Sequence, residues 1–224
     1  MCVWRVWAAL VCATSVFVTD AAAGAWPRER GAWFASATVN LTWPQDLGDV
    51  DRAAPDGRYD ALYLEYGLTD RITLGLDVGR SVSGEAKLVA FAQHPVLPAD
   101  APLRAAAQLG IGKIDDRDVL RPGLSVGRGW EGGWLSTDAL LEQPFDGTGA
   151  DVKLDATWGL RLRADRRLIL QLQTGKQTGD PAFARLAPSL VMPLRGPLSA
   201  EVGGTYGVTG DDSVGLKLGL WAEF

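Results

Sequence analysis

The sequence ends on residues 214–224, V-G-L-K-L-G-L-W-A-E-F, which alternate between apolar and mixed side chains without interruption. One parity holds valine, three leucines, alanine and phenylalanine, whereas the other holds two glycines, lysine, tryptophan and glutamate. Successive side chains of a β-strand point to opposite faces, so a period of two predicts a strand with one apolar face. The number of such strands, and the side on which the apolar face lies, then decide the fold.

The same period of two recurs along the chain, and no segment shows the period of 3.6 that predicts a helix. Turn signals rich in glycine, proline and aspartate separate the alternating runs. The predicted strands are residues 32–43, 58–66, 71–82, 85–93, 103–114, 119–128, 133–143, 150–163, 167–176, 183–193, 198–208 and 214–224. About twelve strands, an even number, favour an all-β fold: a closed antiparallel up-and-down barrel with both ends on one side.

The N-terminus has the layout of a secretory signal peptide. Arg5 is followed by an apolar run over residues 6–18, and Ala21-Ala22-Ala23 provides a small-residue cleavage site, so we expect a signal peptide at 1–23 and the barrel at 24–224. A membrane anchor would need about twenty apolar residues, and Asp20 interrupts too early. Both cysteines, Cys2 and Cys12, lie in the predicted signal peptide, so the mature chain carries no disulfide.

The inventory of the polar face decides between a soluble and a membrane barrel. A soluble periplasmic barrel or sandwich buries its apolar face, whereas a transmembrane barrel turns that face to lipid. Here the opposite face is almost purely aliphatic, with aromatics near strand ends, among them Trp33, Tyr66 and Phe183, as in interfacial girdles. We therefore expect a transmembrane barrel, with the soluble form as the alternative. The predicted lumen-lining residues are Asp77, Arg104, Arg121, Lys153, Asp155, Arg161, Glu201 and Lys217.

Two stretches resemble bacterial outer-membrane β-barrel proteins. The last strand, with Leu216, Leu218 and Leu220 ahead of a final Phe224, resembles their C-terminal insertion signal. Residues 66–76, Y-G-L-T-D-R-I-T-L-G-L, look like a strand–turn–strand unit of proteobacterial barrels described as porins or transporters. The resemblance implies an outer-membrane location with a periplasmic C-terminus. It also implies contact with outer-membrane lipid and lipopolysaccharide, and with the barrel-assembly machinery during insertion.

Enzymatic chemistry finds little support in the residues. The single histidine, His94, heads a proline-rich turn on the predicted periplasmic side, and the mature chain has no cysteine, so triad and zinc chemistry lack their usual groups. Residues 127–132 match G-x-G-x-x-G, but a strand rather than a helix is predicted to follow, which favours a tight turn. We expect no enzyme, cofactor or metal site, and the net charge of −5 disfavours nucleic-acid binding.

Aspartates gather on the predicted outer turns. The two clusters are Asp115, Asp116 and Asp118, and Asp211 with Asp212. Aspartate favours turns for local reasons. The alternative interpretation is an acidic outer mouth that enriches cations or bridges lipopolysaccharide phosphates through divalent ions.

The predicted lumen holds acids and bases in near balance, which leaves two outcomes open. The charges either pair and close the barrel or line a narrow wet pore. About twelve strands is intermediate between filled and open barrels, and the many lumen glycines favour open space. We expect a narrow passive channel for small hydrophilic solutes or ions. The alternatives are a closed structural barrel and, less favoured, a lipid-modifying barrel enzyme. The solute and the oligomeric state stay open.

Overall fold

The computed structural model describes residues 24–46 and 54–224, so the predicted signal peptide lies outside the described residues. The described chain forms a closed barrel of antiparallel strands in which sequence neighbours pair throughout. No helix in those two ranges is long and apolar enough to cross a membrane. The strands are β1 (Trp33–Pro44), β2 (Gly57–Gly67), β3 (Thr73–Ser81), β4 (Ala86–Pro95), β5 (Arg104–Ile114), β6 (Arg117–Trp130), β7 (Gly133–Pro144), β8 (Asp151–Arg161), β9 (Arg167–Lys176), β10 (Phe183–Pro193), β11 (Leu198–Thr209) and β12 (Ser213–Glu223).

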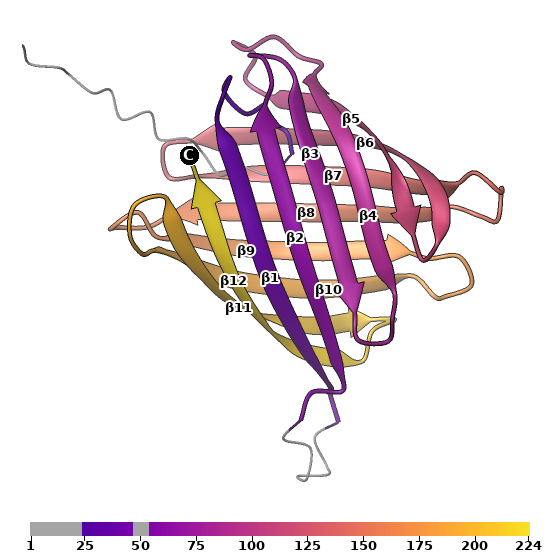
Figure 1. Ribbon diagram of the computed structural model, residues 1–224. Helices are drawn as coiled ribbons and strands as arrows, with labels where there is room; N and C mark the ends of the chain where they lie inside the picture. The colour runs from indigo at the N-terminus through magenta and orange to yellow at the C-terminus, as the bar shows by residue number, and fades with distance from the viewer. Residues whose placement is uncertain (1–23, 47–53) are drawn as a thin grey trace, which may run out of the picture.

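The barrel closes where the first strand meets the last (Figure 1). β1 pairs with β12 from Phe34 opposite Glu223 to Pro44 opposite Ser213. Beyond that ladder, the backbone groups of Trp33 and Phe224 exchange two hydrogen bonds of 3.0 Å. Closure leaves no sheet edge with unpaired backbone groups. We call the end of the barrel at which β1 begins and β12 finishes the terminal end, and the opposite end the loop end.

The predicted twelve-stranded closed barrel is confirmed. One visible difference in bounds is β6, which begins at Arg117 rather than at residue 119. The reason is the turn before it, where Asp115 and Asp116 both take positive φ angles, 49° and 65°. Two such residues make the tight hairpin turn whose twist matches the flanking strands, and aspartate tolerates this conformation. The strands therefore continue right up to the Asp115-Asp116 pair.

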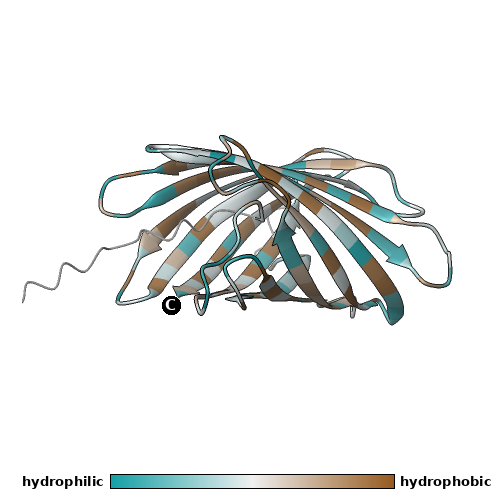
Figure 2. Ribbon diagram, turned by 90° about the horizontal axis from the view of Figure 1, so that it is seen from above, coloured by the Kyte–Doolittle hydropathy of each residue, from teal (hydrophilic) through white to brown (hydrophobic). Residues whose placement is uncertain are grey.

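The apolar face of the strands lies on the outside of the barrel. Along β12, Leu216, Leu218 and Leu220 are 37, 41 and 55% exposed, whereas the alternate residues Lys217 and Trp221 point inward and are partly buried. Figure 2 shows the corresponding alternation of hydrophobic and hydrophilic residues along the strands. Trp33 pairs with Tyr66 near the terminal end, with ring centroids 4.5 Å apart. The outer surface is thus an aliphatic band with aromatic residues near a rim.

Phe183 corrects one part of the predicted aromatic girdle. Its ring lies 5.9 Å from the guanidinium of Arg185, and a Cβ built on Gly175, directly opposite, would come within 2.9 Å of it. Phe183 shares its parity with Arg185, so both side chains belong to the inner face of β10. Its position at the start of the strand suggested a girdle, but the alternation places it inside.

The glycines of the inner face fill a different role from the one expected. A Cβ on Gly159 would overlap the ring of Trp134, the residue directly across β7 and β8. A Cβ on Gly75 would likewise overlap the ring of Phe91, its partner across β3 and β4. At these positions the inference from glycine to open lumen is wrong, because the missing side chain makes room for a neighbouring aromatic ring. Such glycine–aromatic pairs are a known device for supporting weak strand positions.

Candidate functional site: the barrel lumen

A chain of ion pairs crosses the inner wall nearer the loop end. Asp77 on β3 contacts Lys87 on β4 at 2.8 Å and Arg121 on β6 at 2.5 Å. Arg121 also lies 3.9 Å from Glu142 on β7, and Glu142 pairs with Lys153 on β8 at 2.8 Å. Every contact joins side chains from different strands, so the chain ties β3, β4, β6, β7 and β8 across the interior.

The middle of this chain is fully buried. Arg121 is 1% exposed and Glu142 is 3% exposed. The Arg121 guanidinium also lies 5.7 Å from the ring centre of Phe91, which covers its face. Charges so far from water are tolerated only when partners and hydrogen bonds replace their hydration, so these residues form a fixed part of the wall.

Nearer the terminal end, Glu201 on β11 is the centre of a second buried network. It accepts hydrogen bonds from Lys217 Nζ and Ser189 Oγ, each 2.7 Å from Oε1, and from Trp221 Nε1, 3.0 Å from Oε2. The side chain of Glu201 is 1% exposed, compared with 25% for that of Lys217. Three donors from two strands, β10 and β12, therefore hold one carboxylate in a single position.

The segment before β1, residues 24–32, enters the terminal half of the barrel with its first five residues, and residues 29–31 are exposed. Gln93 Nε2 on β4 donates to the carbonyl oxygen of Gly24 at 2.5 Å. Further along, the Arg28 backbone N–H donates to Thr73 Oγ1 at 2.9 Å, and Arg28 Nε pairs with Glu65 Oε2 at 2.5 Å. Glu65 also accepts a 2.8 Å hydrogen bond from the Tyr63 hydroxyl. Residues 24–32, which we call the N-terminal strap, are thus held by β2, β3 and β4.

Apolar packing holds the strap as well. Ala25 is 1% exposed, and Trp26 packs against the buried cluster of Trp134, Ile169 and Val191. The indole of Trp26 also occupies the space that a side chain on Gly127 would need. The strap therefore narrows the terminal half of the lumen. Sequence reasoning missed it because nine residues without alternation carry no periodic signal, although the apolar Ala25-Trp26-Pro27 ahead of β1 is a trace of its burial.

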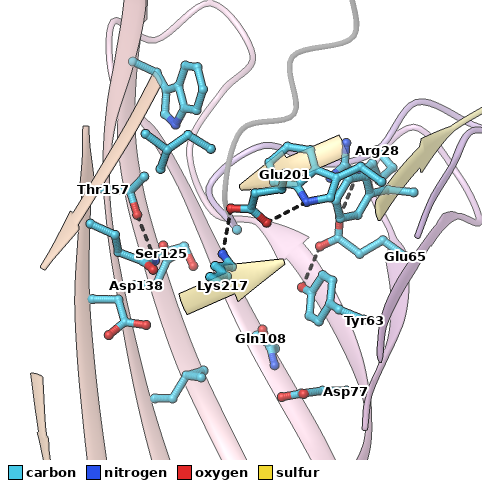
Figure 3. Close-up of a pocket in the computed structure, with 18 of the residues that line it drawn as sticks. Arg28, Tyr63, Glu65, Asp77, Gln108, Ser125, Asp138, Thr157, Glu201 and Lys217 are labelled. Carbon is cyan, nitrogen blue, oxygen red and sulfur yellow. Dashed lines mark hydrogen bonds and ion pairs between the residues drawn. The ribbon is translucent and has the colours of Figure 1, made fainter. Parts of the chain in front are cut away.

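A cavity of about 280 Å³ remains between the strap, the two ion-pair networks and the strands (Figure 3). Its wall includes polar side chains such as Gln108, Thr157 and Gln171, and the ring of Phe34. The charged lining residues are Glu65, Asp77, Asp138, Asp155 and Glu201, together with Arg28, Arg121 and Lys217. Five carboxylates against three cations give the cavity wall an excess of negative charge.

The predicted lumen residues fall into two groups. Asp77, Arg121, Asp155, Glu201 and Lys217 line the cavity, and Lys153 lies beside it on Glu142. The other two, Arg104 and Arg161, lie at the rim of the terminal end. Arg104 donates to the carbonyl oxygens of Pro98 and Ala99 in the turn before β5. Arg161 donates to the carbonyl oxygen of Trp130 at 2.5 Å.

The acidic residues of the loop end belong to two hairpins, β5–β6 and β11–β12, and differ in their surroundings. Asp118 pairs with Lys113 at 2.9 Å, and Asp115 Oδ1 accepts a 3.0 Å hydrogen bond from the Ala86 backbone. Asp116 and Asp212 are exposed. Within residues 24–46 and 54–224, no group of three or more acidic, histidine or cysteine side chains is arranged to hold a metal ion.

Asp211 is the most structured of these acids. Its carboxylate contacts Arg185 Nε at 2.5 Å and accepts hydrogen bonds from the backbone and hydroxyl of Ser213, at 3.0 and 2.6 Å. Partial burial raises the pKa of Asp211, but the hydrogen bonds from Ser213 and Arg185 outweigh it, so the pKa lies below its ordinary value. Asp211 thus caps the turn between β11 and β12 as an anion.

Comparison with known proteins rests on shape. No family description matches this sequence, and no curated protein sequence is significantly similar to it. Among solved structures, the KdgM porin in complex with disordered oligogalacturonate aligns with a TM-score of 0.64 at 10% identity, over 84% of this chain and 99% of that one. The NanC porin aligns with a TM-score of 0.63 at 8% identity, over 85% and 100%.

An outer membrane channel from Pseudomonas putida F1 aligns with a TM-score of 0.55 at 13% identity, over 91% of this chain and 99% of that one. All three similarities span nearly the whole of the known barrels, at identities that carry the fold and no more. The chain has the closed-barrel fold of outer-membrane porins and channels.

Proposed function

We propose that this protein is exported by a signal peptide at residues 1–23 and forms a narrow passive channel in the bacterial outer membrane. The observation that supports it most is the cavity of about 280 Å³ in a porin-like barrel, whose wall carries charged and polar side chains among aromatic and aliphatic ones. A barrel that served only as a scaffold would gain nothing from a polar interior, since buried charges cost free energy unless paired. Small hydrophilic solutes or ions are the cargo that such a wall fits.

The charge of the cavity wall gives the channel a preference for cations. Five carboxylates and three cationic side chains line it, and the loop end adds the exposed Asp116 and Asp212. The similar KdgM porin was solved with oligogalacturonate, a polyanion. An excess of carboxylates would repel such a solute, so a polyanion of this kind is not the cargo that we propose for this chain.

The proposed orientation in the membrane assigns each end of the barrel to one side. The terminal end faces the periplasm, and the last strand with Leu216, Leu218, Leu220 and Phe224 carries the signal for the barrel-assembly machinery. The loop end faces lipopolysaccharide, whose phosphates divalent ions bridge to the exposed aspartates. Replacing Phe224 with Asp should lower the amount of assembled, heat-modifiable barrel, and Phe224→Tyr is the matched control. Unchanged assembly of the Phe224→Asp variant would reject the signal.

Planar-bilayer recording tests the channel itself. The protein purified from outer membranes should conduct, and its reversal potential in a salt gradient should show weak cation preference that grows as ionic strength falls. The triple variant Asp115→Asn, Asp116→Asn, Asp212→Asn separates the loop end from the cavity wall, since it should remove part of the preference and leave the conductance nearly unchanged.

A closed structural barrel is the second candidate, favoured by the strap and by the ion pairs that span the interior. A protein that inserts but passes no current at any voltage would establish this alternative.

A further inference from the structure

Two carboxylates in the middle of the lumen face each other without a cation. Asp138 on β7 and Asp155 on β8 occupy directly opposite positions, and both line the cavity. Within the described parts of the chain, neither has a basic nitrogen within 4.0 Å. Like charges at opposed positions destabilise a strand pair, so this arrangement calls for a positive charge nearby.

The cationic side chains of the cavity wall are committed elsewhere. Arg121 contacts Asp77, Lys217 contacts Glu201, and Arg28 contacts Glu65. Lys153, the nearest base along β8, pairs with Glu142 at 2.8 Å. The positive charge that would balance Asp138 and Asp155 therefore has to come from a group other than these side chains.

Gly24, the first residue of the strap, touches Asp138. A Cβ built on Gly24 would lie 2.5 Å from Asp138 Oδ1 and would also overlap Ser125 Oγ. The nitrogen of Gly24 is bonded to the same Cα, so it lies within about 5 Å of that carboxylate oxygen. The hydrogen bond from Gln93 to the Gly24 carbonyl holds the residue at this depth. Only glycine fits here without displacing the carboxylate.

Signal-peptide cleavage would turn this nitrogen into a cation. In the precursor the Gly24 nitrogen belongs to an uncharged peptide bond. Hydrolysis of the Ala23–Gly24 bond by a signal peptidase consumes one water molecule and leaves a carboxylate on Ala23 and an amine on Gly24, which takes up a proton. The ordinary pKa of an α-amino group is about 7.7–8.0, so most of it is charged at neutral pH.

We propose that the α-amino group of Gly24 forms an ion pair with Asp138 inside the lumen and fastens the N-terminal strap across it. Asp155, opposite Asp138, adds to the field that holds the ammonium. Processing of the precursor thereby supplies the missing positive charge and sets the width of the channel in one step. The inference rests on the signal peptide of the proposed function and is independent of whether the barrel conducts.

The reactivity of the terminal amine tests the pair. The full chain is expressed with its own signal peptide and purified from outer membranes, and its mass should begin at Gly24. Reductive methylation with formaldehyde, followed by mass spectrometry of the N-terminal peptide, should be about tenfold slower in the wild type than in Asp138→Asn, since the paired ammonium keeps its proton. Asp146→Asn, in the exposed turn after β7, is the matched control and should label like the wild type.

A second variant leaves every barrel residue in place. Insertion of Ala-Ser between Ala23 and Gly24 moves the new amine away from Asp138, so the amine should label as fast as in Asp138→Asn, and the strap should loosen. This variant decides the matter if Asp138→Asn does not assemble. A mature chain that begins elsewhere, or a wild-type amine as reactive as that of the insertion variant, overturns the proposal. If the amine is protected from methylation but the barrel carries no current, the channel function is rejected and the ion pair of Gly24 with Asp138 stands.

Discussion

The two halves of the lumen are narrowed by different means. Toward the loop end, side chains of the strands themselves pair across the interior, from Lys87 through Asp77 and Arg121 to Glu142 and Lys153. Toward the terminal end, the strap enters from outside the sheet and is held by Gln93, Glu65 and the packing of Trp26.

Removing Arg121 from the loop-half network leaves buried carboxylates without their shared partner, whereas removing the Trp26 indole from the strap leaves no charge behind. From this difference we expect the free energy of unfolding to depend most on the loop half and the conductance to depend most on the terminal half.

The largest expected effect is on stability in the loop half. Arg121→Met keeps much of the side-chain volume but leaves Asp77 and Glu142 without their shared buried partner. Breaking a buried ion pair on one side costs about 3–5 kcal/mol of unfolding free energy. Urea unfolding of the barrel in detergent would measure it. Lys113→Met is the control, because its pair with Asp118 is 60 and 65% exposed and such pairs contribute below about 1 kcal/mol. Equal effects of the two substitutions would contradict the comparison.

A smaller effect is expected where an aromatic ring covers a glycine in the terminal half. Gly159→Ala places a methyl group where the ring of Trp134 lies, and such overpacking costs about 1–3 kcal/mol. Gly129→Ala is the matched control. Gly129 lies opposite Trp134 on the other side, in β6, and the atom nearest to a Cβ built there belongs to Trp26 and is 3.9 Å away. The same unfolding assay should find Gly129→Ala neutral. A neutral Gly159→Ala would mean that the ring moves freely into the cavity.

The strap is expected to govern conductance more than stability. Trp26→Ala removes a partly buried indole and should cost only about 1–2 kcal/mol by area burial. Because the indole narrows the terminal half of the lumen, single-channel conductance should rise several-fold. Arg121→Met, where it assembles, should change conductance less. A Trp26→Ala channel with wild-type conductance would show that the narrowest point lies elsewhere.

The strands that form the wall of the lumen could be predicted from the sequence, whereas the N-terminal strap inside it could not, for a physical reason. Every second side chain of a strand points to the same face, so the period of two is enough to assign Leu216, Leu218 and Leu220 to one face. The strap has no repeat, and its partners Gln93, Glu65 and Thr73 come from distant positions in the chain. The glycines were misjudged similarly, because the ring that covers Gly159 belongs to another strand. Contacts between elements without a shared period stay invisible until the register is known.

The smallest expected effect concerns the rim of the loop end and depends on pH. The pKa of Asp211 lies below its ordinary value of 3.8, because hydrogen bonds from Ser213 and Arg185 outweigh its partial burial. A depressed pKa in the folded state stabilises the barrel above the ordinary value, and this contribution is lost as pH falls through the folded pKa. Asp211→Asn should therefore lower the thermal midpoint slightly at pH 7 and make no difference once the wild-type carboxyl is protonated.

Asp212→Asn is the control, because the side chain of Asp212 is exposed and its substitution should leave the thermal midpoint at pH 7 unchanged. A loss in Asp211→Asn that persists at the acid end would assign the effect to the geometry of the turn rather than to charge. The turn between β11 and β12 would then be held by its geometry, and the electrostatic contribution to the loop half would be confined to the network around Arg121.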